Sequence, residues 1–240
     1  MDVGTVRIPK RSNAEREDRP GHAESMTGTR ISLSSAIADV AARDPVLAHV
    51  VGLVGPIKHR PRDPDGHFGA LVRAIVFQQL AGPAARAIHQ RVRALVDGEL
   101  TPDTLADVPD DALRGAGLSA AKLASVRDLS VKVRDGTVVL DRSATRSDDE
   151  IVAGLVTVRG IGRWTAEMYL MFELRRLDVW PVDDLGVRQG YGVAWGLAPP
   201  PSPKELAPLG ERFRPYRSVV ARYCWEAVAL LRGGTDPSLR

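Results

Sequence analysis

Apolar side chains recur every three or four residues along most of the chain, which is the spacing of one face of an α-helix. The segment 67–79 illustrates the pattern, because its apolar residues would all lie on one side of a helix. This face consists of Phe68, Leu71, Val72, Ile75 and Val76. The same pattern predicts helices at 67–79, at 83–96, opening at Thr101, at 120–134, at about 148–157, at about 163–175, from near Asp184, after Ser202, and at 215–232.

The residues at the ends of these segments support the assignment. Ser119 stands where a helix N-cap is expected, and Ser147 with Glu150 has the spacing of a capping box. Only the stretch TVVL at 137–140 suggests a short strand. Because strands do not alternate with these helices, the fold is predicted to be all-α and to lack the βαβ units of dinucleotide-binding proteins.

The polarity of the chain changes near residue 30. Residues 1–30 are polar and charged without periodicity, so we expect a disordered tail, and Met26 is an alternative start. Residues 31–240 are predicted to form one helical domain, built from two packed subdomains with a cleft between them. One subdomain comprises roughly 67–175. The other comprises the N-terminal segment together with 176–232.

Composition excludes several classes of function. The single cysteine, Cys224, rules out an internal disulfide and an all-cysteine cluster. The five histidines lack metal-ligand spacing, so no catalytic metal or other cofactor is expected. The chain has no run of about 18 apolar residues and no leader pattern, so we expect a cytoplasmic protein without a membrane span. The net charge of +3 is a weak indication of a polyanionic partner. Most basic residues are arginine, which suits phosphate contacts, although a codon bias would give the same excess.

The stretch VRGIGRWTAEMYL, residues 158–170, places Gly160 and Gly162 between two predicted helices. A dinucleotide fingerprint would need a third glycine where Thr165 stands, and a strand before the first. Helix, glycine turn and helix instead form a helix-hairpin-helix. Its backbone N–H groups from about Gly162 to Thr165 would face an anion such as a phosphate, and the turn carbonyls before them can hold a monovalent cation. The alternative is a plain connection between two helices.

The stretch VWPVDDLGVRQGY, residues 179–191, places Asp183 and Asp184 at the start of a predicted helix. The helix dipole and the first-turn amides stabilise a carboxylate there as an anion. Beside a sugar, such an anion can stabilise an oxocarbenium-like transition state and orient a water molecule. The alternative is that one of these aspartates is simply an N-cap.

Together, LVTVRGIGRWTAEMYLMF and VWPVDDLGVRQGY resemble the helix-hairpin-helix DNA glycosylases, with their Gly/Pro-rich loop and catalytic aspartate. The closer similarity is to the bacterial 3-methyladenine DNA glycosylase II branch, the alkylation-repair enzymes. FGALVRAIVFQQLAGPAARAI, GLSAAKLASV and RPYRSVVARYCW also look like that branch. The resemblance covers roughly residues 40–232.

This resemblance implies a glycosylase of base excision repair. It would flip alkylated purines, such as 3-methyladenine and 7-methylguanine, out of duplex DNA and hydrolyse their N-glycosidic bond. Asp184 matches the catalytic aspartate, which stabilises positive charge on the deoxyribose and helps water to attack C1′, whereas Asp183 is assigned no chemistry. Trp164 stands where relatives that also cut the backbone have a nucleophilic lysine, which implies a monofunctional enzyme. The iron–sulfur cluster of some relatives needs four cysteines and is not expected.

The resemblance also assigns the surrounding residues. Trp164, Trp225, Met168 and Tyr169 would form the base pocket, in which an indole face attracts a cationic alkylated base. Trp225 could instead be a core residue of the last helix, and for Tyr169 the core assignment is the favoured one. Met168 departs from the aromatic residue that family members often have there. The residues that would contact DNA or fill the gap left by the flipped base are Gly160, Gly162, Arg163, Thr165, Gln79, Leu80 and Arg217, of which Arg217 could instead brace Asp184. The carbonyls that would hold the cation, Na⁺ or K⁺, when DNA is bound are those of Val156, Val158 and Ile161.

The expected partner is double-stranded DNA with damaged bases, bound by a monomer associated with the nucleoid. Two other interpretations stay open. One is a glycosylase for deaminated or mismatched bases with the same aspartate chemistry. The other is a non-catalytic helix-hairpin-helix DNA-binding module, which would have no use for Asp184 or for an aromatic pocket.

Overall fold

The chain is helical throughout the part described by the computed structural model, which comprises residues 31–141, 145–231 and 233. No β-strand occurs within these residues, so the all-α prediction is confirmed. No helix among them is long and apolar enough to cross a membrane. The tail predicted for residues 1–30, with the alternative start at Met26, lies outside the described residues.

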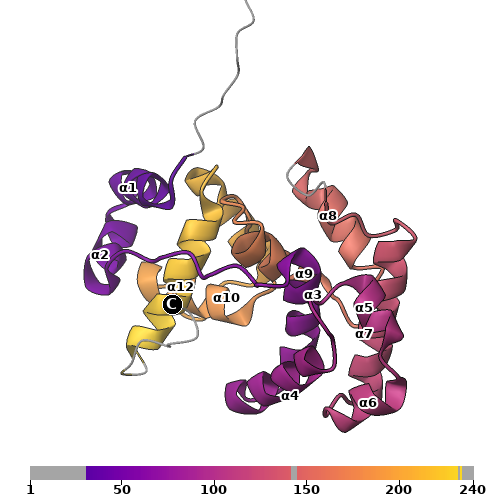
Figure 1. The fold of residues 1–240 in the computed structure, drawn as a ribbon. Coiled ribbons are helices and arrows are strands. Elements are labelled where there is room, and N and C mark those ends of the chain that lie inside the picture. Colours follow the sequence, from indigo (N-terminus) through magenta and orange to yellow (C-terminus); the bar gives the residue numbers. More distant parts are fainter. Residues whose placement is uncertain (1–30, 142–144, 232, 234–240) are drawn as a thin grey trace, which may run out of the picture. The chain divides into compact units, whose positions relative to one another are not determined.

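The order of the helical elements along the chain can be followed in Figure 1. They are α1 (Leu33–Arg43), α2 (Pro45–Val54), α3 (Gly66–Phe77), α4 (Gly82–Ala94), α5 (Pro102–Asp107), α6 (Asp110–Gly115), α7 (Ala120–Arg134), α8 (Asp148–Leu155), α9 (Arg163–Met168), the π-helix η2 (Tyr169–Glu173), α10 (Leu185–Trp195), α11 (Pro203–Leu209), the 3₁₀-helix η3 (Glu211–Phe213) and α12 (Arg217–Leu231). Capping side chains fix several starts as predicted, among them Ser119 before α7 and the Ser147–Glu150 capping box before α8.

Two local predictions are wrong. The segment 137–140 is not a strand, because the backbone N–H of Val138 returns to Lys132 O, at the end of α7, at 2.8 Å and no strand pairs with it. The segment 163–175 is not one regular α-helix. After Met168 the chain widens into a π-helical turn, in which Leu174 N donates to Tyr169 O at 3.1 Å, a geometry that often occurs at functional sites.

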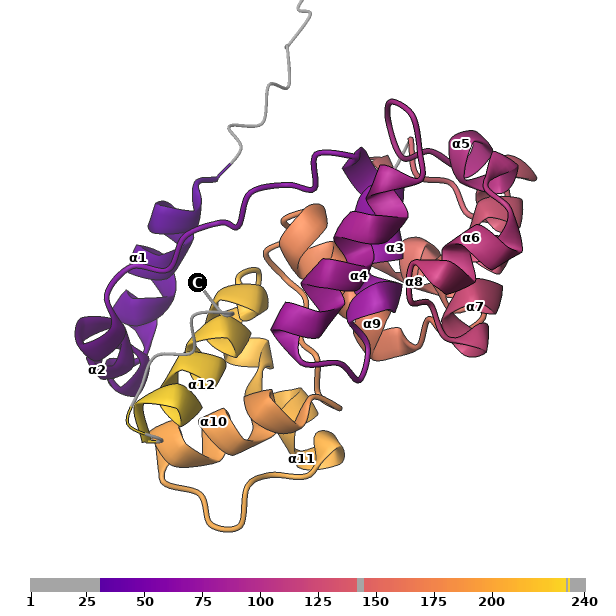
Figure 2. The same ribbon diagram turned by 60° about the horizontal axis from the view of Figure 1, so that its bottom comes forward.

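One group of helices packs around α12. Helices α10, α1 and α2 all contact it, and α10 and α12 run side by side (Figures 1 and 2). Buried Asp44 caps the start of α2 by accepting from Leu47 N at 2.9 Å, and it also accepts from Arg212 at 3.0 Å. Trp195, near the end of α10, donates to the same carboxylate at 3.3 Å. A buried carboxylate with three donors therefore joins α2, α10 and η3.

A second group of helices packs around α3 and α7. Helix α3 contacts α4, α7 and η2, while α5 and α6 pack on α7 and α8 packs on α9. Buried Asp65 accepts from Arg93 Nε at 2.7 Å and from Leu100 N at 3.1 Å, which ties the start of α3 to the end of α4. The two groups fall within the residue ranges expected for two subdomains. The chain from Ile31 on nonetheless forms one compact unit, and the subdomain boundary stays a prediction.

Helices α10 and α12 approach each other at backbone distance. A Cβ added at Gly190 would lie 1.8 Å from the carbonyl oxygen of Cys224, which is far inside van der Waals contact. Neither backbone can yield without separating the two helices, because Gly190 and Cys224 are both buried. Gly190 thus sets the spacing of the helix pair.

We expect Gly190→Ala to lower the free energy of unfolding by about 3 kcal/mol, because the added methyl group forces α10 away from α12. Chemical denaturation followed by circular dichroism measures this change. Gly52→Ala is the matched control, since Gly52 is also helical but has nothing within 4 Å of an added Cβ. The control should be neutral or stabilising by up to about 1 kcal/mol. Equal stabilities of the two variants would contradict the close approach.

Candidate functional site

Asp184 lies at the N-terminus of α10, where its carboxylate receives three hydrogen bonds. Oδ1 accepts from the backbone N–H of Val187 at 2.7 Å and from Trp225 Nε1 at 2.8 Å, while Oδ2 accepts from Trp164 Nε1 at 2.6 Å. The bond to Val187 alone would be explained if Asp184 were simply the N-cap of α10. Two indole N–H groups from α9 and α12 on the same carboxylate go beyond a cap, and they hold its plane in one orientation.

Gly186 allows Trp225 to reach this carboxylate. A Cβ at position 186 would lie 2.8 Å from Cδ1 of Trp225 and 3.1 Å from Asp184 Oδ1. With Gly190 one turn further along α10, the glycine at 186 forms a Cβ-free strip against α12. Gly186, the glycine of the sequence motif DLG, is therefore a second site residue. Sequence analysis missed it, although its position two residues after Asp184 could have indicated it.

The carboxylate borders a cavity of about 560 Å³, a size that suits a small ligand. Its lining residues are Arg60, Ala74, Phe77, Gln78, Gln79, Trp164, Thr165, Met168, Phe172, Asp184 and Trp225. Six residues predicted for the site line this cavity. Four were assigned to catalysis or the base pocket, namely Asp184, Trp164, Trp225 and Met168, and two were assigned to DNA contact, namely Gln79 and Thr165. Trp164 is 49% exposed, an unusual degree for tryptophan in a folded chain, so a large part of its indole is open to solvent.

Phe172 and Arg60 belong to this cavity although sequence analysis did not select them. The Phe172 ring stacks on the indole of Trp225, with ring centroids 5.9 Å apart and an interplanar angle of 21°. The Arg60 guanidinium lies 4.3 Å from the centroid of the Phe172 ring. Phe172 follows Met168 by four residues, a helical spacing that could have indicated a shared face. Arg60 lies in the connection between α2 and α3 and carried no signal.

Tyr169 does not line the cavity beside Asp184. It lines a neighbouring cavity of about 220 Å³, together with Asp63, Arg73 and Glu173. Its ring packs edge-on against His67 at 5.9 Å, and burial raises the pKa of its hydroxyl. Tyr169 is thus a buried core residue, which is the assignment that the sequence favoured, and it lies beside the cavity that Asp184 borders rather than in it.

The glycine hairpin has the geometry expected of it. Gly160 has φ of +77°, and a Cβ there would lie 2.6 Å from Ser125 Oγ, so both the turn and its packing require glycine. Gly162 is the N-cap of α9 with φ of −90° and open space where a Cβ would be. A ligand can thus approach the start of α9, where no side chain caps the helix.

Asp128 and Lys132 on α7 form hydrogen bonds with the backbone of this hairpin. Asp128 Oδ2 accepts from the backbone N–H of Arg159 at 2.6 Å and from Lys132 Nζ at 2.8 Å. Lys132 Nζ also donates to the carbonyl oxygen of Thr157. The carbonyl of Val158 accepts from Ile161 N at 3.0 Å, and both apolar side chains are buried.

The turn after α3 is joined directly to the hairpin. Gln78 Nε2 donates to the carbonyl oxygen of Gly160 at 2.9 Å. Lys122 Nζ donates to the carbonyls of Val76 at 2.5 Å and Gln78 at 2.8 Å, and burial lowers the pKa of this ammonium group. Gln79 has φ of +55°, which is strained for a residue other than glycine. Backbone strain often marks a functional position, and Gln79 and Leu80 are both exposed at this turn.

Comparisons with known proteins place this site in a family. A family model described as "HhH-GPD superfamily base excision DNA repair protein" matches residues 72–215. The DNA-3-methyladenine glycosylase 1 of Schizosaccharomyces pombe is 32% identical over 203 residues, which are 83% of this chain and 89% of that protein. The crystal structure of a DNA-3-methyladenine glycosidase from Bacillus halodurans matches with a TM-score of 0.75 and 34% identity, covering 82% and 91% of the two chains.

A 3-methyladenine DNA glycosylase of Schizosaccharomyces pombe, solved in complex with abasic DNA, matches with a TM-score of 0.68 and 31% identity over 80% of this chain and 95% of that one. The chain belongs to the HhH-GPD superfamily. Within that superfamily, it lies in the alkylation-repair branch that the sequence motifs indicated.

Two arginines of this HhH-GPD protein are committed to ion pairs. Arg217 donates to Asp178 from Nε at 2.8 Å and to Glu211 at 3.2 Å, so it does not brace Asp184 as considered from the sequence. Its contact with DNA stays a prediction. Arg163 pairs with buried Glu167 at 3.0 Å. Burial raises the pKa of Glu167, and the Arg163 charge opposes this effect.

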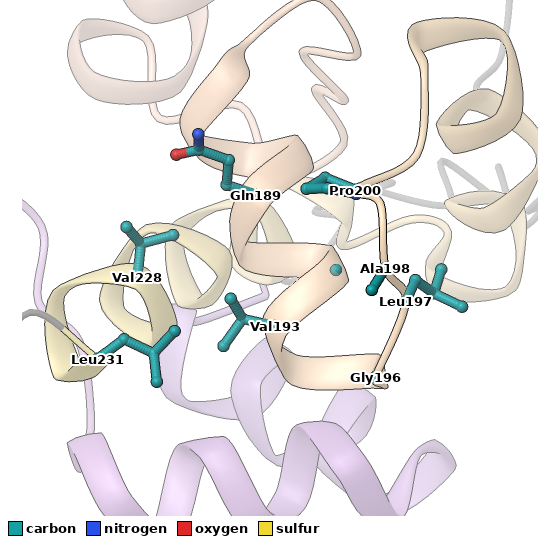
Figure 3. Close-up of a pocket in the computed structure, with 9 residues that line it drawn as sticks. Gln189, Val193, Gly196, Leu197, Ala198, Pro200, Val228 and Leu231 are labelled. Atoms are coloured by element: carbon teal, nitrogen blue, oxygen red, sulfur yellow. The ribbon is translucent and has the colours of Figure 1, made fainter.

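A second apolar cavity, of about 510 Å³, lies at the other end of α10 (Figure 3). It is lined by Val193 of α10, by Val228 and Leu231 of α12, and by the connection from Gly196 to Pro200. No acidic or basic side chain lines it among the described residues, so it offers no chemistry for a reaction. Groups of three or more His, Cys, Asp or Glu side chains arranged to hold a metal ion are also absent from the described part of the chain.

We expect Asp128→Asn to loosen the hairpin, because the Arg159 amide loses a charged acceptor and Lys132 loses its counter-ion. Hydrogen exchange at the Arg159 amide should accelerate by about fivefold at pH 7. Exposed Asp111 on α6 provides the control variant, Asp111→Asn, which should leave this amide unchanged.

The effect of Asp128→Asn should also depend on pH. Burial raises the pKa of Asp128, but hydrogen bonds from Lys132 and the Arg159 amide outweigh it and leave the pKa below its usual value. The stabilisation is then present above the unfolded-state pKa and lost as pH falls through the folded-state pKa. The stability difference between wild type and Asp128→Asn should therefore shrink on acidification. A difference that grows below pH 4 would contradict the bracing role.

Proposed function

We propose that this HhH-GPD protein is a monofunctional DNA glycosylase of base excision repair that hydrolyses the N-glycosidic bond of alkylated purines in duplex DNA. The observation that carries the proposal is the carboxylate of Asp184, held by two indole N–H groups at the edge of an aromatic cavity. A DNA-binding module has no need of such a carboxylate or of a cavity beside it. Relatives in the alkylation-repair branch are named as 3-methyladenine glycosylases, which supports the substrate class.

In the proposed reaction, the bond between C1′ and the base nitrogen breaks and the base takes the bonding electron pair. Positive charge then develops on the deoxyribose, and the carboxylate of Asp184 stabilises it. A water molecule adds to C1′ and loses a proton. The three donors on Asp184 keep it oriented before the substrate arrives, so little reorganisation is needed in the transition state.

The target nucleotide would leave the duplex to enter the cavity. Trp164 and Trp225 would border the flipped base, with Met168 on the cavity wall. Gln79 and Leu80, exposed on the strained turn, would fill the gap left in the duplex. Trp164 and Trp225 each present an indole N–H to Asp184, so the aromatic rings and the carboxylate would act on one nucleotide.

The hairpin would hold the DNA backbone without reading its sequence. Gly160, Gly162, Arg163 and Thr165 would lie along one phosphate, because the start of α9 is open there. A monovalent cation, if bound, would be held by the carbonyls of Val156, Val158 and Ile161 and would supply positive charge against the phosphate. The protein would act on duplex DNA as a monomer associated with the nucleoid.

We expect Asp184→Asn to reduce release of 7-methylguanine from a methylated duplex by about a hundredfold or more, because the neutral amide cannot stabilise the cationic sugar. Duplex affinity should change little, and the fold should persist because asparagine is also a good N-cap. Single-turnover release and fluorescence anisotropy measure the two quantities. The neighbouring, exposed Asp183 gives the control variant Asp183→Asn, which should release base at the wild-type rate. Equal loss of binding and release in Asp184→Asn would contradict its role.

We also expect that sodium borohydride will not trap this protein on damaged DNA. Trapping needs a Schiff base between an amine and C1′, and no lysine is among the described residues that line the cavity. Electrophoresis after borohydride treatment detects the adduct, with a glycosylase known to form one as the positive control. A trapped adduct would overturn the monofunctional assignment and make Lys122, beside the Gln78 turn, the first residue to test.

A further inference from the structure

Arg60 and Asp184 are joined by a series of contacts through two aromatic rings. The Arg60 guanidinium lies over the Phe172 ring at 4.3 Å, Phe172 stacks on Trp225, and Trp225 donates to Asp184. Arg60, Phe172, Trp225 and Asp184 all line the same cavity. The wall of this cavity therefore carries both a cation and an anion, which are linked to each other through the rings of Phe172 and Trp225.

Arg60 belongs to the connection between α2 and α3. The course of this connection is visible in Figure 2. The carbonyl oxygen of Arg60 accepts from Arg175 at 3.2 Å. Two residues earlier, the carbonyl of Lys58 accepts from Arg222 at 2.6 Å, and that of Gly55 accepts from the hydroxyl of Tyr223 at 3.0 Å. The backbone of this connection is thus hydrogen-bonded to α12 and to Arg175, which follows η2, so Arg60 is carried by a segment that is anchored at several points.

A second guanidinium lies near the same ring, and the buried carboxylate of Glu226 partly offsets its charge. Arg222, buried on α12, lies 5.9 Å from the centroid of the same Phe172 ring. Burial, together with the charge of nearby Arg60, lowers the pKa of Arg222 to about 10, so it stays protonated at neutral pH. Asp63, Arg73 and Glu173 face the neighbouring cavity, which Arg60 also lines.

Heterolysis of the glycosidic bond moves electrons in one direction, from C1′ onto the base. With Asp184 beside the sugar, the base would lie in the cavity that Arg60 also lines. We propose that Arg60 is the electrostatic counterpart of Asp184: its guanidinium favours the electron flow onto the departing base, and it shifts the substrate range toward neutral lesions. This inference rests on the proposed glycosylase function.

The charge of Arg60 should affect the binding and the release of neutral and cationic bases differently. A neutral lesion such as hypoxanthine gains negative charge as it leaves, and its carbonyl oxygen offers an acceptor for a guanidinium. A cationic lesion such as 7-methylguanine is repelled on binding and loses that repulsion as the bond breaks. Arg60 would thus speed bond cleavage for both lesions, but it would weaken binding of the cationic one only.

The test compares wild type with Arg60→Gln, Arg60→Met and Arg60→Lys on duplexes that differ only in the lesion, hypoxanthine or 7-methylguanine. Single-turnover release over a range of enzyme concentrations gives the maximal rate constant and the half-saturation concentration for each. Arg62→Gln is the matched control, because Arg62 is an exposed arginine in the same connection and lines neither cavity. Thermal unfolding confirms that each variant is folded.

For Arg60→Gln and Arg60→Met, the maximal rate constant should fall for both lesions by about tenfold, the order expected from removing one unit charge about 10 Å away at an effective dielectric constant of about 20. The half-saturation concentration should fall only for 7-methylguanine. The ratio of rate constant to half-saturation concentration should therefore shift about tenfold toward 7-methylguanine. Arg60→Lys, which keeps the charge, should retain most of the wild-type selectivity, and Arg62→Gln all of it.

The outcomes separate the two proposals. If wild type releases both bases but neutral substitutions at Arg60 change the two lesions equally, Arg60 has only a structural role and the inference is overturned. The same holds if Arg60→Lys behaves like Arg60→Gln. If wild type releases neither base, the proposed function itself is wrong.

Discussion

The contact on which the site depends is the backbone approach of α10 to α12 at Gly190 and the carbonyl of Cys224. Helix α10 carries Asp184 at its first turn, and α12 carries Trp225 on the adjoining face. A side chain at position 190 would separate the helices, and the bond of 2.8 Å between the Trp225 indole and the Asp184 carboxylate would open. The position of the Asp184 carboxylate is thus set by the absence of a side chain at Gly190, about two turns further along the helix.

Around that carboxylate, the chain combines groups that would be costly to bury separately. A carboxylate beside aromatic rings loses water, and the indole N–H groups of Trp164 and Trp225 replace part of that hydration. Phe172 places a further ring next to Trp225, and the guanidinium of Arg60 covers it. The cavity therefore has largely apolar walls and two charged groups, and a planar ligand bound in it would be oriented by these two charges.

The helices, the glycine hairpin and the aspartate beside it could be predicted from the sequence, because each depends on local rules: apolar periodicity, capping residues and glycine at a turn. Trp225 and Met168 came from family resemblance, since nothing local distinguishes a pocket tryptophan from a core one. Arg60, Phe172 and Gly186 were missed because their roles exist only after distant helices pack together. The π-helical turn that begins at Tyr169 was missed, because a backbone bulge leaves no mark in side-chain periodicity. The segment 137–140 shows that β-branched residues do not make a strand without a partner.

The hydrogen bond from Gln78 to the carbonyl of Gly160 joins two parts of the molecule that are 82 residues apart in sequence. One is the turn that bears Gln79 and Leu80, and the other is the loop that would meet the phosphates. Lys122 fastens the same turn to α7, so the turn, the loop and α7 are joined by a short series of hydrogen bonds. If the loop binds the DNA backbone and the turn displaces a nucleotide from the duplex, these two events would be thermodynamically linked through this hydrogen bond. The same contact would then serve both binding to undamaged DNA and opening of the duplex at a lesion.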